Sequence, residues 1–219
     1  MHIGVLGGTG PAGQGVTLRF AAAGITVTVG SRSKERAEQI AAKLREQYPR
    51  RQLPIVGGDN TDAASADVVV VATPWDAAAP TVAAVRPLLA GKVVISMANA
   101  LTRVGDEFVP LIPPRGSVAA WIQAAVPESL VAAALHHVPA RELTNLEHEM
   151  AADVLVCSDH PRATEVVSEL IAMMPGLRPL DAGVLASASA IEALTPVLLQ
   201  INARYKTRAS IRLTNINLG

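Results

Sequence analysis

A glycine-rich turn near the N-terminus constrains the fold more than any other feature of the sequence. The apolar run 3–6 leads into Gly7-Gly8-Thr9-Gly10-Pro11-Ala12-Gly13, where Gly8, Gly10 and Gly13 have G-x-G-x-x-G spacing. In such a loop the glycines allow a tight turn, close approach of the backbone to a pyrophosphate, and close packing of the next helix on the strand. Free N–H groups at the start of that helix attract negative charge. The spacing therefore predicts a dinucleotide-binding loop.

The surroundings of the turn support this interpretation. A helix is expected over residues 11–23, with Pro11 in its first turn, and a second strand over 25–29 completes a β-α-β unit. A purely structural turn without a ligand is the alternative, and the complete unit makes it the weaker one.

The end of the second strand indicates which dinucleotide binds. An enzyme that uses NAD usually carries Asp or Glu there, which accepts hydrogen bonds from the ribose 2′-hydroxyl. This chain has Gly30-Ser31-Arg32 instead, followed by Arg36. A serine hydroxyl and a guanidinium suit a 2′-phosphate, and Arg36 would face the same phosphate if Ser33 caps the next helix. The pattern favours NADP over a merely solvated basic surface.

Strands and helices alternate through most of the chain, which predicts an α/β, Rossmann-type doubly wound and mostly parallel sheet. We expect ligands outside the carboxyl ends of its strands, at the loops 7–13, 30–32, 73–76, 96–101 and 136–141. Further strands are expected over residues 53–56, 67–72, 92–96, 129–135, 154–157 and 177–180, helices over 34–47, 75–89, 118–125, 161–174 and 185–203, and a loop over 104–116.

The sequence also suggests two parts. Residues 1–150 are expected to form the NADP-binding domain, and 151–219 a small C-terminal appendage of helices and strands. Pro196 is expected to kink the last helix, and residues 206–219 are polar and irregular.

Composition excludes several classes of protein. Lys plus Arg and Asp plus Glu both number 19, so the chain lacks the basic excess of a nucleic-acid-binding protein. The single cysteine, Cys157, lies in an apolar run and is expected to be a buried, inert thiol in a reducing compartment. Neither a targeting segment nor a membrane-spanning run is visible, which predicts a cytoplasmic protein. His148-Glu149 has no second histidine to complete H-E-x-x-H, so no metal site is expected.

Several segments in order resemble one family. These are the glycine loop, Gly30-Ser31-Arg32, Thr73-Pro74-Trp75, and above all the segments 134–140 (ALHHVPA) and 176–183 (GLRPLDAG). The chain resembles the NADPH-dependent reductases of coenzyme F-420, an 8-hydroxy-5-deazaflavin, over nearly its whole length. The two later segments are much more specific than the Rossmann motifs, which many enzymes share.

The resemblance implies a site. It places Thr9, Gly10, Pro11 and Ala12 at the pyrophosphate of NADP, and Ser31, Arg32 and Arg36 at the 2′-phosphate, although the family often has Lys at the last position. It implies that other residues lie near the cofactor, namely Pro74, Trp75, Ala79, Met97, Ala98, Asn99 and Ala140. The deazaflavin pocket would contain His136, Val138, Ser187, Thr195 and Leu198.

The resemblance further implies direct, reversible hydride transfer between NADP(H) and the deazaflavin in a homodimer, with no catalytic side chain needed. It also implies that the C-terminal segment, residues 151–219, completes the deazaflavin pocket and the dimer interface. We expect the small residues Ala98, Ala100 and Ala140 to leave room for the flat ring. The apolar residues of the last helix would need a covering surface: Ile191, Leu194, Val197, Leu198 and Ile201. The arginines and lysine near the C-terminus could meet an acidic tail of the deazaflavin, but facing water is the simpler interpretation. An NADPH reductase with a flavin, imine or metal-centre acceptor, or a non-catalytic NADPH sensor, remains the alternative.

Overall fold

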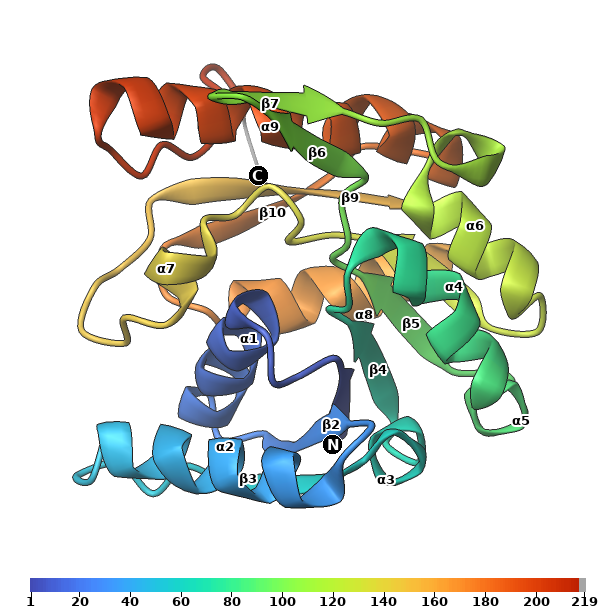
Figure 1. Ribbon diagram of the computed structural model, residues 1–219, viewed down its shortest axis with the longest axis vertical. Coiled ribbons are helices and arrows are strands. Elements are labelled where there is room, and N and C mark those ends of the chain that lie inside the picture. The colour runs from blue at the N-terminus through green and yellow to red at the C-terminus, as the bar shows by residue number, and fades with distance from the viewer. Residues whose placement is uncertain (217–219) are drawn as a thin grey trace.

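The computed structural model describes residues 1–216 and contains one eight-stranded sheet (Figure 1). Its strand order is β10-β9-β8-β5-β4-β1-β2-β3. The pairings are parallel except between β8 and β9, which run antiparallel. The strands are β1 His2–Leu6, β2 Thr26–Ser31, β3 Ile55–Asp59, β4 Val68–Val71, β5 Val93–Ser96, β8 Leu130–Ala133, β9 Ala152–Ser158 and β10 Leu177–Asp181. This confirms the predicted Rossmann-type sheet.

Helices cover both faces of the sheet because the buried strands are apolar on both sides. Val68 and Val70 of β4 pack in one core and Val69 and Val71 in the other. The first core includes the helices α1 Pro11–Ala22, α2 Lys34–Gln47 and α8 Pro161–Ala172. The second includes α3 Asn60–Ala64, α4 Trp75–Ala84, α5 Arg86–Leu89, α6 Val118–Ala125 and α9 Ala188–Tyr205.

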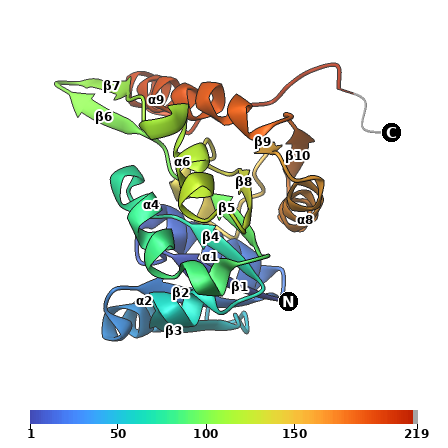
Figure 2. The same cartoon turned by 90° about the vertical axis from the view of Figure 1, so that its right-hand side faces the viewer.

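The C-terminal part continues the same sheet, since β9 pairs with β8 and β10 with β9. A separate hairpin of β6 Leu101–Val104 and β7 Glu107–Pro110 packs beside α9. Figure 2 shows this hairpin and α9 together at the end of the molecule opposite β2 and β3.

The hairpin corrects the prediction of a loop over residues 104–116. Prolines in that stretch favoured a loop, but Pro110 stands at the end of a short two-stranded sheet, where its missing N–H is tolerated. The turn is the two-residue pair Gly105-Asp106, and Gly105 has φ +58°. This dipeptide is itself a hairpin signal.

Other predicted boundaries also change. The helix expected over 75–89 breaks at Val85, because Pro87 cannot donate the backbone hydrogen bond that a continuous helix needs. The last helix is preceded by a 3₁₀ turn, Leu185–Ser187. Pro196 lies inside α9, which continues on both sides of it as one helix. Two short helices, α3 and α7 Ala140–Leu143, were not predicted.

Candidate functional site

The glycine loop has the geometry that its spacing predicts. Gly7 adopts φ +74°, and the N–H of Gly8 donates to the carbonyls of Val5 (3.1 Å) and Gly30 (3.0 Å). A Cβ atom on Gly13 would lie 2.7 Å from the Gly7 oxygen and from the Gly8 Cα, so only glycine lets α1 start here. Gly10 is the N-cap of α1 and Pro11 its first residue. The start of α1 therefore offers free N–H groups to an anion.

A cleft of about 540 Å³ extends from this loop to the ends of β2, β3 and β4. Ser33 caps α2, because its hydroxyl accepts a hydrogen bond from the N–H of Arg36 (3.2 Å). Arg32 and Arg36 are exposed, and neither forms an ion pair among residues 1–216. The polar residues that line the cleft are Thr9, Ser31, Arg32, Arg36, Asn60, Thr73 and Thr81.

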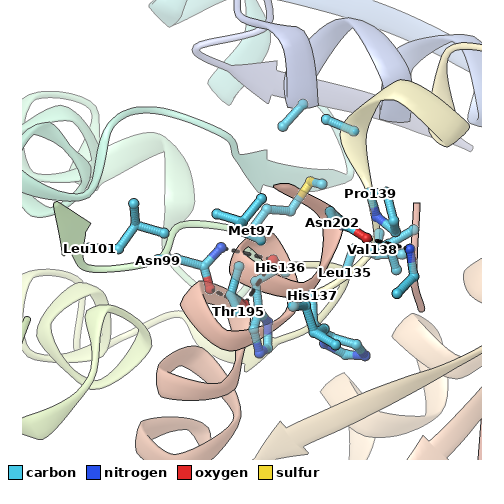
Figure 3. Close-up of a pocket in the computed structure, with 15 residues that line it drawn as sticks. Met97, Asn99, Leu101, Leu135, His136, His137, Val138, Pro139, Thr195 and Asn202 are labelled. Atoms are coloured by element: carbon cyan, nitrogen blue, oxygen red, sulfur yellow. Dashed lines mark hydrogen bonds between the residues drawn. The ribbon is translucent and has the colours of Figure 1, made fainter. Parts of the chain in front are cut away.

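A second, more apolar cavity of about 190 Å³ lies where β5, β8 and α9 approach each other (Figure 3). Ala12, from the first turn of α1, also lines it. The other lining residues are Met97, Asn99, Leu101, Leu135, His136, His137, Val138, Pro139, Ala140, Thr195, Leu198, Leu199, Asn202 and Ala209.

Both cavities reach the N-terminus of α1. Gly10 lines the cleft, and Ala12, two residues later, lines the second cavity. A dinucleotide whose pyrophosphate lies on this helix terminus would place one half in the cleft beside Arg32 and direct the other half toward the second cavity.

A hydrogen-bond network holds the second cavity together (Figure 3). The Asn99 amide Nδ2 donates to the carbonyl of His136 (2.8 Å), and the Thr195 hydroxyl donates to Asn99 Oδ1 (2.9 Å). These bonds join the loop after β5, the loop after β8 and helix α9. Leu135 adopts φ +65°, an uncommon conformation for a bulky residue, and begins the turn that carries His136.

The two histidines of the cavity are buried and close together, with ring centroids 5.0 Å apart. His137 Nε2 lies 3.1 Å from the Asp153 carbonyl, whereas neither ring nitrogen of His136 has a protein partner. Burial, with a further contribution from His137, lowers the pKa of His136 to about 3. His136 is therefore neutral near pH 7.

This burial makes stability depend on pH. The pKa of His136 is about 3 in the folded chain, below the usual value of about 6.5 in an unfolded chain. Stability should therefore be complete above pH 6.5 and decrease as the pH falls toward 3, by about 2 kcal/mol between pH 6.5 and 5. In urea titrations, the free energy of unfolding of His136→Asn should change less with pH over this range than that of the natural chain. Parallel curves for the two proteins would contradict this account.

A buried arginine fixes the loop that follows the second cavity. Arg19 of α1 is only 3% exposed and donates to four backbone carbonyls, those of Glu142 (2.7 Å), Leu143 (3.1 Å), Asn145 (2.6 Å) and His148 (3.0 Å). It thereby ties residues 142–148 to the helix whose N-terminus forms the glycine loop. Burial lowers the pKa of the guanidinium, but Arg remains charged.

The irregular segment after α9 is anchored by ion pairs and by backbone bonds. Arg208 pairs with Glu142 (2.6 Å), and Leu213 N donates to the buried Asp153 (2.6 Å), which Arg178 also contacts (2.7 Å). Within α9, Arg204 pairs with Glu107 (2.7 Å). Both arginines are thus paired with carboxylates of the same chain, an arrangement that differs from the acidic-tail contact and from side chains that face only water. The expectations for residues 217–219 lie outside the described residues.

Another buried carboxylate joins α9 to α6. Glu192 accepts hydrogen bonds from the N–H groups of Val118 (2.8 Å) and Ala119 (3.1 Å), at the start of α6. Burial raises its pKa to about 7 although these bonds act in the opposite direction. Glu192 lies one turn before Thr195 and so helps to place α9 beside the second cavity.

The structure brings together most of the site residues expected from the sequence. Five of them line neither cavity. Pro11 is exposed between two lining residues, and Trp75 packs near Trp121, with ring centroids 6.4 Å apart. Ala79 is buried, Ser187 lies half-buried in the 3₁₀ turn, and Ala98 is buried in the second core together with Ala100. The small residues that do line the second cavity are Ala12, Ala140 and Ala209.

Some lining residues were missed. Leu199 and Asn202 share a helix face with the predicted Thr195 and Leu198, so helical periodicity could have found them. Asn60 follows a strand end in a helix that was not predicted, and Ala209 lies in the irregular segment, where no sequence pattern marks it.

Three further expectations can be compared with the described residues. Cys157 is buried, and burial raises the pKa of its thiol to about 11, which agrees with an inert thiol. In the part of the chain that the structure describes, no helix has the length and apolar character needed to cross a membrane. Residues 1–216 also hold no group of three His, Cys, Asp or Glu side chains arranged for a metal ion.

Comparison with known proteins decides the family. Residues 2–100 match the family model described as NADP oxidoreductase coenzyme F420-dependent. The chain is 38% identical to the F420-dependent NADP reductase of Methanocaldococcus jannaschii, and the match covers 100% of both chains. It is 39% identical to the protein of the same name from Methanothermobacter thermautotrophicus, over 99% of this chain and 96% of the other. The chain belongs to the F420-dependent NADP reductase family.

Solved structures agree with this membership. A putative F420-dependent NADP reductase from Arthrobacter has a TM-score of 0.79 and 25% sequence identity, covering 96% of this chain and 99% of that one. The pyrroline carboxylate reductase of Plasmodium falciparum has a TM-score of 0.55 at 15% identity, covering 92% of this chain and 65% of that one, and thus shares the fold.

Proposed function

We propose that the protein transfers a hydride directly and reversibly between NADP(H) and the deazaflavin coenzyme F420. Family membership supports this proposal. The structural observation that carries it is that two cavities, one basic and one apolar, both reach the start of α1. The basic cleft suits the adenosine half of NADP, and the apolar cavity suits the nicotinamide with a flat acceptor beside it.

The cavities fit these groups. Gly7, Gly8 and Gly13 let the loop pack closely, because an added Cβ atom would lie within 3 Å of protein atoms at each of them, and α1 begins directly at this loop. Buried polar atoms without protein partners also concentrate here. They include Thr73 Oγ1 at the cleft and both ring nitrogens of His136 at the second cavity. Orphaned polar atoms of this kind commonly mark places where a ligand or water completes the hydrogen bonding.

The residues of the chain would bind and orient the two cofactors and exclude water from the site. The start of α1 would hold the pyrophosphate, and Ser31, Arg32 and Arg36 the 2′-phosphate. The Asn99–His136–Thr195 network would keep the apolar walls in place, with His136 neutral at its edge. When bound, the nicotinamide C4 supplies the hydride and the deazaflavin C5 accepts it, so that NADPH, oxidised deazaflavin and one proton give NADP⁺ and reduced deazaflavin. Proximity of the two rings would supply most of the catalysis.

Isotope transfer tests the proposal. NADPH deuterated at nicotinamide C4 should bleach the visible absorbance of F420 and deliver deuterium to C5 without dilution by solvent protons. FMN and FAD should be reduced much more slowly. Faster reduction of a flavin, an imine or a metal centre would instead identify a reductase with another acceptor. NADPH binding with no turnover would indicate a sensor.

Arg32 tests the preference for the phosphorylated cofactor. Arg32→Ala should weaken NADPH binding about 10- to 150-fold, because a hydrogen bond to a charged group contributes about 1.5–3 kcal/mol. NADH binding should hardly change, and calorimetry of both cofactors measures the contrast. Equal losses for the two would reject this role for Arg32.

We also propose a homodimer. The hairpin β6–β7 and its continuation expose Val104 (62%) and Ile112 (92%), and α9 beside it exposes Val197, Ile201 and Tyr205. Monomeric proteins seldom expose a large contiguous apolar surface. The surface differs from the one expected, because Ile191 is buried in the core and Leu198 lines the second cavity.

Sedimentation checks the assembly. The natural chain should sediment as a dimer at micromolar concentration, and Ile201→Lys should shift it toward the 22.8 kDa monomer, because a charge would be buried in the interface. A natural chain that is entirely monomeric would refute the homodimer.

A further inference from the structure

Asn60 lies at the phosphate end of the cleft, although nothing in its sequence context marks it. Strands β2 and β3 run parallel with Ser31 opposite Asp59, so the next residue, Asn60, stands at the same sheet edge as Ser31 and Arg32. It lines the cleft together with Ser31, Arg32 and Arg36. Asn60 thus adds a neutral amide to the hydroxyl of Ser31 and the guanidinium groups of the two arginines.

The amide oxygen of Asn60 lies on the side of β2. Its Oδ1 atom is buried without a hydrogen-bond partner. That oxygen lies beside Gly30, where it would be 3.4 Å from an added Cβ. The residue as a whole is only half-buried. With the oxygen on that side, the NH₂ group is the end of the amide left for a ligand in the cleft, and an amide NH₂ can only donate.

We propose that Asn60 is a specificity-determining residue that donates a hydrogen bond to the ribose 2′-phosphate of NADP. This inference rests on the proposed function, because it assumes that NADP occupies the cleft. Arg32 and Arg36 would neutralise the charge of the phosphate, and Asn60 would donate from the opposite strand end. A donor here favours a phosphate, whereas a carboxylate in its place would repel the phosphate and accept from a free 2′-hydroxyl.

The carboxylates of Asp59 and Asp62, on either side of Asn60, are held away from the 2′-phosphate position by other partners. Asp59 accepts from the N–H groups of Thr61 (2.7 Å) and Asp62 (2.8 Å), and Asp62 accepts from the N–H of Asp59 (3.1 Å). Asp62 is also paired with Lys34 (3.1 Å). Both carboxylates are thus engaged by their own helix terminus or by a lysine, and neither lines the cleft.

Fragments of the cofactor give a test that does not require hydride transfer. Binding of 2′,5′-ADP and of 5′-AMP, which lacks only the 2′-phosphate, is measured by calorimetry for the natural chain, Asn60→Ala and Asn60→Asp. Asn60→Ala should weaken 2′,5′-ADP about tenfold or more and leave 5′-AMP unchanged, as expected for the loss of one hydrogen bond to a charged group. Asn60→Asp should weaken 2′,5′-ADP further and bring the ratio of the two affinities toward one.

Thr61→Asp is the matched control. It adds the same charge one residue later, in the same helix, at an exposed position outside the cleft lining. It should retain most of the preference for 2′,5′-ADP, and thermal unfolding should show all three variants folded. If the natural chain itself does not prefer 2′,5′-ADP to 5′-AMP, the NADP assignment fails. If it does prefer 2′,5′-ADP but Asn60→Ala keeps the full preference, or Thr61→Asp abolishes it as Asn60→Asp does, the role of Asn60 is overturned and the NADP assignment stands.

Discussion

Replacing Arg19 by methionine should lower the free energy of unfolding by about 3–5 kcal/mol, a large fraction of the stability of a typical domain. The methionine can replace the packing of the aliphatic stem but not the four hydrogen bonds to carbonyls 142, 143, 145 and 148. Buried carbonyls left without a donor each cost free energy comparable to a lost hydrogen bond. Urea titration of the purified variant measures the loss.

Arg45→Met is the matched control, because Arg45 of α2 donates to one backbone carbonyl, that of Ile55. The same substitution there should lower stability by only about 1 kcal/mol. Similar losses of stability for Arg19→Met and Arg45→Met would show that the four hydrogen bonds of Arg19 stabilise the fold no more than the single bond of Arg45.

Loss of the four Arg19 hydrogen bonds should also affect KM for the acceptor more than KM for NADPH. Arg19 holds residues 142–148, which follow directly on the cavity residues 136–140, whereas the cleft residues near Arg32 lie on other elements. Arg19→Met assayed at a temperature where it is folded should therefore raise KM for F420 while KM for NADPH stays close to that of the natural chain. A uniform increase in both would assign Arg19 a purely global role.

Local sequence signals were sufficient for most of the fold. Apolar runs marked the strands of the sheet, and glycine spacing marked the loop before α1, because both signals lie within a few residues of the structure they specify. The errors came from short elements. The helix α3 has five residues and the hairpin strands four each, and the prolines of residues 110–114 outweighed the Gly105-Asp106 turn signal.

Site residues could be predicted from the sequence where they directly follow a strand, because the ends of parallel strands share one edge of the sheet. They could not be predicted where segments far apart in the chain pack together. Strand ends placed Ser31, Arg32, Asn99 and His136 at one edge of the sheet. Arg19 gave no signal, since its partners lie more than 120 residues away in the chain. The burial of Glu192 against the start of α6 likewise depends on packing that neither segment reveals alone.

Ala140→Phe should nearly abolish reduction of F420 while sparing NADPH. Ala140 begins α7 and lines the second cavity of about 190 Å³, so a phenyl ring there would occupy the space of the acceptor. Because the side chain is half-buried at a helix start, the variant should fold. Displacing an acceptor by about 1 Å can already reduce a rate about 100-fold, so exclusion of the ring should cost at least that much in kcat/KM for F420.

Ala98→Phe separates this effect from simple overpacking. Ala98 is also a small residue near the end of β5, but it is buried in the second core and does not line the cavity. The larger ring should therefore destabilise this variant by about 1–3 kcal/mol, with F420 reduction per folded molecule largely kept. NADPH affinity, followed by calorimetry, should remain within about threefold of the natural chain in Ala140→Phe, because the adenosine and pyrophosphate contacts lie in the separate cleft. If Ala140→Phe reduces F420 normally, the acceptor does not enter by this cavity. If it loses NADPH and F420 together, the nicotinamide and not the deazaflavin fills the space beside Ala140.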